Sequence, residues 1–170
     1  MRSKSGFTIV ELLIVIVVIG VLATITIVAY NGIQNRANDT RRISDVSNMQ
    51  KALLLYRTQS GSFPQAVPNP GYSTWEISTD PNFLNSLSSI TSTKFSAPAG
   101  SVYWYRAFNA GEYGCPVNLG PYHILWAHDM KTQSAARIDS GPCTGQTLFV
   151  TSPTAGAFTV GANDYAVYGF

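Results

Sequence analysis

A single carboxylate interrupts a long apolar stretch near the start of the chain. Glu11 is the one charged residue between Phe7 and Ala29, a run that contains no Lys, Arg, Asp, Asn or Pro. As a helix this run would span roughly 35 Å, enough to cross a hydrocarbon core of about 30 Å. A carboxylate in such a core costs around 3 kcal/mol, and more when it is unpaired. A passive anchor has no use for Glu11, unless the residue lies at the water-facing start of the helix and does nothing there.

The segment around Glu11 has a specific pattern. It reads Lys4-Ser5-Gly6-Phe7-Thr8-Ile9-Val10-Glu11-Leu12, in which a short basic leader precedes a Gly–Phe junction and a Glu follows shortly after. This pattern resembles the leader and cleavage site of a type IV prepilin. Gly20, Leu22-Ala23 and Ala29-Tyr30 extend the resemblance along the N-terminal helix. Val28 departs from it, since the family commonly has a helix-weakening Pro there. Family-style melting of the helix between residues 20 and 28 is therefore not carried over.

The resemblance implies a maturation and assembly process. A prepilin peptidase would cut between Gly6 and Phe7 on the cytoplasmic side, and the new amine of Phe7 would be N-methylated. Mature subunits would leave the membrane and stack into a filament with their apolar helices at its core. Glu11 would then pair with the Phe7 amine of a neighbouring subunit or with its own, which removes the cost of two buried charges.

The resemblance also implies partners and a location. The partners are other copies of the chain, the prepilin peptidase, the inner-membrane assembly machinery and, before assembly, membrane lipid. The chain would cross the cytoplasmic membrane once, with its N-terminus inside, and would end in an extracellular filament. The expected organisation is a leader (1–6), a transmembrane and filament-core helix (7–29), an amphipathic helix half (30–60) and an extracytoplasmic domain (61–170).

Beyond Ala29 the pattern predicts a continuing helix with one apolar face. Apolar residues recur at steps of three and four or their sums: Ile33, Ala37, Ile43, Val46, Met49, Leu53 and Tyr56. Most charged residues fall off this stripe: Asp39, Arg41, Arg42, Asp45, Lys51 and Arg57. Gly61 and Pro64 then favour a helix end near Gln59.

The remainder of the chain predicts a connecting segment followed by strands. Residues 62–100 are rich in Pro, Ser and Thr, with helical turns expected only at 82–89. Aromatic and branched residues predict strands at 101–108, 122–128, 135–138, 147–150 and 165–170. The expected fold class is α+β: a pilin-like fold in which the long helix packs on a small antiparallel sheet.

Charge and cysteine content narrow the function classes. Removal of the leader takes away Arg2 and Lys4 and leaves equal numbers of basic and acidic residues. A near-zero net charge argues against broad electrostatic binding of nucleic acid. Cys115 and Cys143 are expected to form a disulfide if the domain is exported, the alternative being two separate buried thiols.

No residue pattern predicts catalysis, a metal or a cofactor. His123 and His128 point to opposite faces of one strand, and no nucleophile motif accompanies them. Relatives in secretion pseudopili often bind calcium, but Asp129, Asp139 and Asp164 are too scattered in sequence to transfer that property. The aromatic residues of the strands either stack on sugars or a host surface or, as we favour, fill the core; they are Tyr103, Trp104, Tyr105, Tyr122 and Trp126.

The sequence thus predicts a structural pilin of a type IV pilus-like filament, used for adhesion, twitching or DNA uptake, and not an enzyme. One alternative is a pseudopilin of a type II-like secretion system. A second is a membrane-anchored extracellular binding domain, against which the Gly6-Phe7 junction and Glu11 argue.

Overall fold

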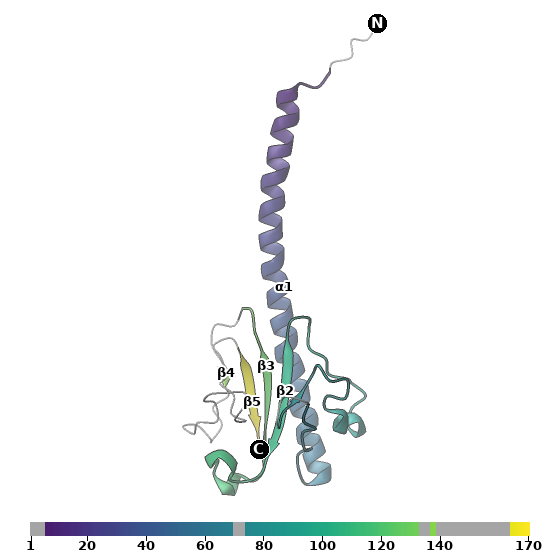
Figure 1. Ribbon diagram of the computed structural model, residues 1–170, viewed down its shortest axis with the longest axis vertical. Helices are drawn as coiled ribbons and strands as arrows, with labels where there is room; N and C mark the ends of the chain where they lie inside the picture. The colour runs from purple at the N-terminus through teal and green to yellow at the C-terminus, as the bar shows by residue number, and fades with distance from the viewer. Residues whose placement is uncertain (1–5, 70–73, 133–136, 139–163) are drawn as a thin grey trace. The chain divides into compact units, whose positions relative to one another are not determined.

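The computed structural model describes residues 6–69, 74–132, 137–138 and 164–170. The chain divides into two compact units, Met1–Ala37 and Asn38–Phe170. One helix, α1 (Ile9–Ser60), contributes residues to both units, and all the strands belong to the second (Figure 1). The predicted long N-terminal helix is therefore confirmed.

The first unit is helical from Ile9 onward, and its apolar side chains are exposed. By length and composition α1 contains a segment able to cross a membrane, and none of that segment is buried within the chain. Hydroxyl groups in this segment bond inside the helix: Thr24 donates to the Gly20 carbonyl at 2.9 Å and Thr26 to the Leu22 carbonyl at 2.8 Å. Helical structure continues without a break past Val28, as expected of a residue that keeps its backbone N–H.

The second unit contains a sheet with strand order β1-β2-β3-β5-β4. The strands are β1 (Glu76–Ile77), β2 (Val102–Phe108), β3 (Tyr122–His128), β4 (Arg137–Ile138) and β5 (Tyr165–Gly169). The pairs β1–β2, β2–β3 and β3–β5 are antiparallel, which confirms the α+β prediction, while β4 joins β5 in parallel. Within the described residues, three short 3₁₀ helices lie between strands: η1 (Asn85–Ser89), η2 (Glu112–Gly114) and η3 (Val117–Leu119).

Alternation along the strands produces two apolar clusters, one on each face of the sheet. On one face the C-terminal half of α1 packs against the sheet, through Val46, Met49, Leu53, Tyr103, Tyr105, Leu125 and Val167. The other face holds a cluster that contains all three tryptophans of the chain, with Trp75, Trp104, Trp126, Ile124 and Tyr168 among its members. The aromatic side chains that could have stacked on a ligand are thus core residues: Tyr103, Trp104, Tyr105, Tyr122 and Trp126 are each 9% exposed or less.

The structure corrects part of the predicted helix stripe. Val46, Met49 and Leu53 are fully buried, but Ile33 is 69% exposed. Asp39 and Arg42 are buried, each only 1% exposed, although we placed them off the stripe. Their burial follows from an ion pair that apolar periodicity does not register.

The connecting segment differs from its prediction in two respects. It contains the short edge strand β1, which the Pro-rich composition did not indicate, and its helical turn is limited to η1. The strand predicted at 147–150 and part of that at 135–138 lie outside the described residues.

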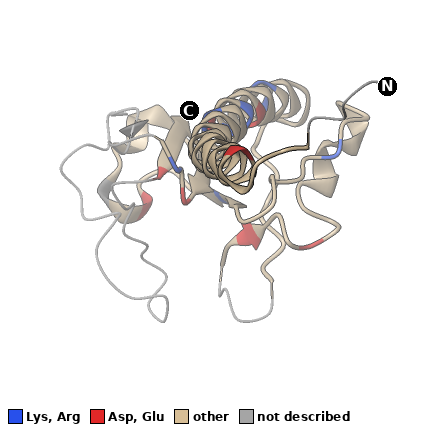
Figure 2. Ribbon diagram, turned by 90° about the horizontal axis from the view of Figure 1, so that it is seen from above, with Lys and Arg blue, Asp and Glu red and all other residues tan. Residues whose placement is uncertain are grey.

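Among the residues that are described, Lys, Arg, Asp and Glu are few and interspersed, with most of the ribbon uncharged (Figure 2).

Candidate functional site

The predicted processing residues lie just before the helix. Gly6, Phe7 and Thr8 are non-helical, and α1 begins at Ile9. The Phe7 side chain is 83% exposed. A Cβ at Gly6 would meet nothing within 4 Å, so contacts with the described residues do not require a glycine there.

Thr8 and Glu11 bond to each other across the first turn of α1. The Glu11 carboxylate accepts hydrogen bonds from the Thr8 backbone N–H at 2.8 Å and from the Thr8 hydroxyl at 2.8 Å. The Thr8 hydroxyl oxygen in turn accepts from the Glu11 N–H at 3.2 Å. This arrangement is a capping box, in which two side chains satisfy N–H groups that a helix start leaves without intrahelical partners.

The capping box changes the interpretation of Glu11. The Glu11 carboxylate has hydrogen-bond partners, because it accepts two hydrogen bonds from Thr8. A third hydrogen bond joins the Glu11 backbone N–H to the Thr8 hydroxyl. None of the ion pairs formed by the described residues includes Glu11, so its charge is not neutralised within this part of the chain. Sequence reasoning missed Thr8, although the spacing Thr8-x-x-Glu11 before an apolar run is the signal of this motif.

A second polar site, in the globular unit, was not predicted at all. The Asp39 carboxylate on α1 accepts from Arg42 Nη1 at 2.7 Å, from the Lys131 N–H at 2.9 Å and from the Thr132 N–H at 2.6 Å. The Thr132 hydroxyl donates to the same carboxylate at 2.7 Å, and Arg42 Nη1 also donates to the Asp129 carbonyl at 2.9 Å. Asp39 and Arg42 thus tie the helix to the segment that follows β3.

The electrostatics of Asp39 reflect these contacts. Burial alone would raise the pKa of the Asp39 carboxyl, but hydrogen bonds from Thr132 and Lys131 and the charge of Arg42 outweigh it and lower that pKa. The ionised form of Asp39 is therefore the one that the folded unit holds. The role of Asp39 is structural, because its carboxylate oxygens accept hydrogen bonds from Arg42, Lys131 and Thr132 and the residue is only 1% exposed.

The two histidines lie on opposite faces of β3, as predicted. His123 is fully buried against Phe63, and burial together with the charge of Arg57 lowers its pKa to about 3. His128 Nδ1 lies 2.8 Å from Asp164 Oδ1, which also accepts from the Asp129 N–H at 3.0 Å. Among the residues that the structure describes, no cluster of three or more His, Cys, Asp or Glu could hold a metal ion.

Only part of the predicted disulfide can be placed. Cys115 is buried directly after η2, in the cluster on the tryptophan-bearing face of the sheet. Cys143 and Asp139 lie outside the described residues. The pairing of Cys115 with Cys143 stays a prediction.

Comparisons with known proteins point to the N-terminal segment. Residues 1–27 match the model of the prokaryotic N-terminal methylation motif. The chain is 32% identical over 63 residues to type II secretion system core protein G of Aeromonas hydrophila, an alignment covering 37% of this chain and 44% of that protein. It is 34% identical to the core protein G of Escherichia coli K12 over 36% of this chain and 43% of that protein. A fimbrial protein of Pseudomonas aeruginosa is 42% identical over 31% of this chain and 34% of its own length.

These matches concern the N-terminal part of the chain. The segment that matches the methylation motif contains Gly6, Phe7 and Glu11, and the relatives that share this part of the chain are a secretion core protein and a fimbrial protein. The chain spans less than half the length of the three relatives named above. No solved structure matches it significantly.

Proposed function

We propose that the chain is a structural subunit of a type IV pilus-like filament, made as a precursor and assembled through its N-terminal helix. In this proposal a prepilin peptidase cleaves between Gly6 and Phe7, and the Phe7 amine is methylated. The subunit waits in the cytoplasmic membrane with its globular unit outside and then joins an extracellular filament of its own copies. The filament serves adhesion, twitching motility or DNA uptake.

One observation carries the proposal: a charged but capped Glu11 lies at the start of an exposed apolar helix, directly after an accessible Gly6-Phe7 junction. The exposed helix needs an apolar environment, which a membrane or a filament core provides. The Gly6-Phe7 bond lies outside α1 and is open to a peptidase. The charge of Glu11 has no partner among the described ion pairs, so it remains available to an amine created by cleavage.

The second candidate is a pseudopilin of a type II-like secretion system. It is favoured by the matches to core protein G, which appears from several bacteria, whereas the fimbrial protein of Pseudomonas aeruginosa favours the first candidate. A pseudopilin shares the same precursor, peptidase and helix packing, so the two candidates differ in abundance and filament length. A membrane-anchored binding domain is the third possibility, and it requires neither cleavage nor Glu11.

The test is mass spectrometry of sheared surface filaments, with the membrane fraction beside them. The proposal expects the chain to begin at a methylated Phe7 and to dominate the filament preparation. Gly6→Leu should keep membrane insertion but block cleavage, because a bulky residue replaces the small one at the junction. Processed chain confined to short, scarce filaments would favour the pseudopilin. An intact Met1 leader on assembled subunits would contradict the proposal.

A further inference from the structure

A shallow groove of about 260 Å³ lies on one face of α1, just after the apolar run ends at Ala29. Its wall is formed by Val28, Ala29, Gly32, Ile33 and Arg36, and apolar atoms predominate in it. Residues four apart share one face of a helix, so Val28, Gly32 and Arg36 follow one another along the groove. All of the lining residues belong to the first unit and are exposed.

Gly32 forms the floor of this groove. Its backbone is helical and its φ is not positive, so its conformation does not require a glycine. Glycine costs a helix about 1 kcal/mol relative to alanine. A Cβ at Gly32 would meet nothing within 4 Å, and the neighbouring Val28 and Ile33 are 70% and 69% exposed. The glycine therefore leaves an open path along the helix surface between Ala29 and Arg36.

Arg36 lies at the far end of this path. It is the first charged residue after Glu11, and it is exposed. Long side chains on a helix lean toward its N-terminus and cover the preceding turn. For Arg36 the residue one turn earlier is Gly32, which has no side chain to block the arginine stem. The guanidinium can therefore lie in the groove and approach the end of the apolar run.

The groove lies at the depth of the headgroups in a membrane that the apolar run would cross. The headgroup layer extends about 5–7 Å beyond each side of the hydrocarbon core. At the helical rise, Gly32 lies about 4.5 Å beyond Ala29 and the backbone of Arg36 about 10 Å beyond it. Leaning back by one turn, about 5 Å, brings the guanidinium into this layer. Tyr30, which is 64% exposed, is of a residue type enriched at the same depth.

The charges near the groove favour an anionic headgroup. The guanidinium of Arg36 is a planar fork of N–H donors that matches a phosphate. The nearest acidic residue along the chain is Asp39, which is buried and pairs with Arg42 at 2.7 Å. In a zwitterionic headgroup the ammonium competes with arginine for the phosphate, whereas phosphatidylglycerol has no ammonium. The apolar wall suits the glycerol and first methylenes of a lipid better than a free phosphate ion.

We propose that this groove binds the phosphate of an anionic phospholipid from the outer leaflet of the cytoplasmic membrane. Arg36 donates to the phosphate, and the start of the acyl chains lies against Val28, Gly32 and Ile33. The bound lipid holds the subunit at a fixed depth before assembly. This inference rests on the membrane location in the proposed function and adds to it a ligand that filament assembly does not itself require.

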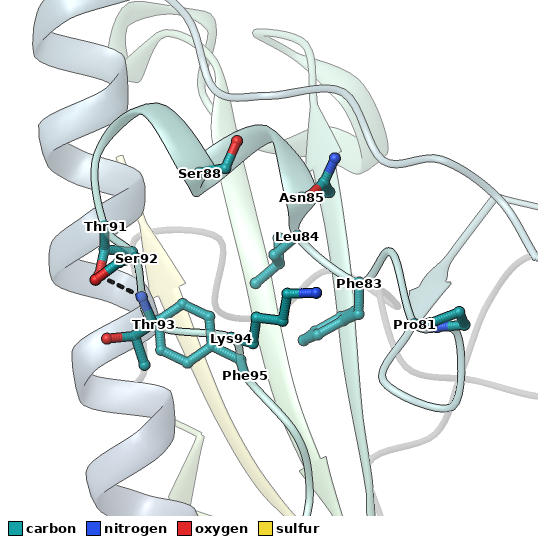
Figure 3. A pocket seen from close by; sticks show the side chains of 10 residues that line it. All are labelled: Pro81, Phe83, Leu84, Asn85, Ser88, Thr91, Ser92, Thr93, Lys94 and Phe95. Atoms are coloured by element: carbon teal, nitrogen blue, oxygen red, sulfur yellow. Dashed lines mark hydrogen bonds between the residues drawn. The ribbon is translucent and has the colours of Figure 1, made fainter.

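A second cation in a cavity wall provides a control. The cavity of about 110 Å³ beside η1 is lined by residues that include Ser88, Thr91, Thr93 and Lys94 (Figure 3). The Thr91 hydroxyl accepts from the Thr93 N–H at 3.1 Å. This cavity lies in the globular unit, outside the apolar run. Lys94→Gln therefore makes the same charge change as Arg36→Gln and leaves the groove on α1 intact.

The experiment is native mass spectrometry of the full chain released from nanodiscs that contain equal amounts of phosphatidylglycerol and phosphatidylcholine with the same acyl chains. Wild type should retain phosphatidylglycerol about fivefold more often than phosphatidylcholine, the factor that corresponds to about 1 kcal/mol for one basic side chain at an anionic surface. Soluble glycerol 3-phosphate in excess should not displace the lipid, because the acyl chains contribute to binding. Displacement would indicate a site for free phosphate and would overturn the lipid assignment.

Two variants in the groove and two controls locate the binding. Arg36→Gln should abolish the preference for phosphatidylglycerol. Gly32→Leu keeps the charge and favours the helix but fills the groove, so it should lower retention of this lipid as much as Arg36→Gln does. Arg41→Gln, on another face of α1, and Lys94→Gln should leave the preference unchanged.

Four results would overturn the lipid site. They are an equal retention of both lipids by wild type, a wild-type preference in Arg36→Gln, a wild-type preference in Gly32→Leu, and lipid-free pairs of chains that Gly32→Leu abolishes. The last result would assign the groove to a second copy of the chain. A chain that does not enter nanodiscs at all would contradict the membrane location and with it the proposed function, whereas a chain that enters without a lipid preference contradicts the lipid site alone.

Discussion

His123 on β3 lies directly opposite Gly169 on β5, and its imidazole occupies the space where a side chain at position 169 would begin. A Cβ added at Gly169 would lie 1.9 Å from Cε1 of His123. The ring is fully buried and packs edge-on against Phe63, with 4.4 Å between ring centres. The missing Cβ at position 169 is what allows a buried histidine at this end of the sheet.

Gly169→Ala should therefore destabilise the globular unit. The new methyl group forces the imidazole or the β3–β5 pairing to move, and overpacking of this kind costs about 1–3 kcal/mol. Equilibrium denaturation of the full chain in detergent measures the loss. Gly32→Ala is the control, because a Cβ there meets nothing within 4 Å and a helix favours Ala over Gly.

A double-mutant cycle tests the cause of that loss. In a His123→Ala background the ring is absent, so Gly169→Ala should cost markedly less free energy of unfolding than in the wild type. Equal costs in the two backgrounds would show that the strain at position 169 does not come from His123.

The adjacent residues Arg41 and Arg42 on α1 are expected to contribute very differently to the free energy of unfolding. The side chain of Arg42 is 2% exposed and pairs with Asp39, whereas that of Arg41 is 58% exposed and lies 3.6 Å from Asp45. Arg42→Ala leaves a buried carboxylate without its counter-ion and should cost about 3–5 kcal/mol of unfolding free energy. Arg41→Ala removes a surface pair and should cost at most about 1 kcal/mol. Similar losses for the two variants, measured by denaturant titration, would contradict the assigned roles.

Two buried carboxylates should respond to pH in opposite directions. The pKa of Asp39 is lowered in the folded unit, so its stabilising contribution is present above the ordinary carboxyl pKa and is lost as pH falls through the lowered value. Glu76 is only 4% exposed, and burial raises its pKa despite hydrogen bonds from the Leu84 and Val67 N–H groups. Its contribution is present below the ordinary carboxyl pKa and is lost as pH rises through the raised value.

Glu76→Gln separates the contribution of Glu76 to the pH dependence of stability from that of Asp39. An amide removes the charge but keeps an oxygen that can accept from the Leu84 N–H. As pH rises from below 4.5 through the raised folded pKa, the variant should gain stability relative to wild type. Unfolding free energies measured across this range for both proteins provide the comparison. A difference that does not change with pH would contradict the raised pKa of Glu76.

The success of the sequence-based predictions differs between regular and irregular parts of the chain. The long helix and the strand at 122–128 follow from periodicity and residue type, and both were predicted with accurate limits. Strand β1 was missed because its two residues are too few to show a pattern and are held by pairing with Trp104 and Tyr105. Burial of such a segment is decided by tertiary contacts rather than by local propensity.

Polar sites were the least predictable. The contacts of Asp39 with Lys131 and Thr132 join residues far apart in the chain, so no local residue spacing predicts these contacts. The capping box of Thr8 and Glu11, by contrast, was visible in the sequence. Its two residues stand at the start of an apolar run, where the cost of burying the Glu11 charge and the unsatisfied N–H groups of a helix start are separate effects of the same carboxylate.

The capping box allows the two roles of Glu11 to be separated. A Gln at this position can still take part in a capping box, whereas Ala cannot. Only Glu carries the charge that would pair with the Phe7 amine of a neighbouring subunit at low dielectric. Glu11→Gln therefore removes the charge and retains the cap, while Thr8→Val removes the hydroxyl that helps to form the cap and retains the charge.

If charge pairing drives assembly, Glu11→Gln and Glu11→Ala should both lower filament yield sharply, and Thr8→Val should lower it less. All three variants should still be cleaved and should insert in the membrane, since none of the three substitutions adds a charge to the apolar segment. The measurement is filament yield in sheared fractions beside the membrane pool of processed subunit, in cells that lack the wild-type chain. Normal filaments from Glu11→Gln, together with a loss in Thr8→Val, would assign the role of Glu11 to helix capping. Normal filaments from Glu11→Ala would show that assembly depends on neither the charge nor the capping by Glu11.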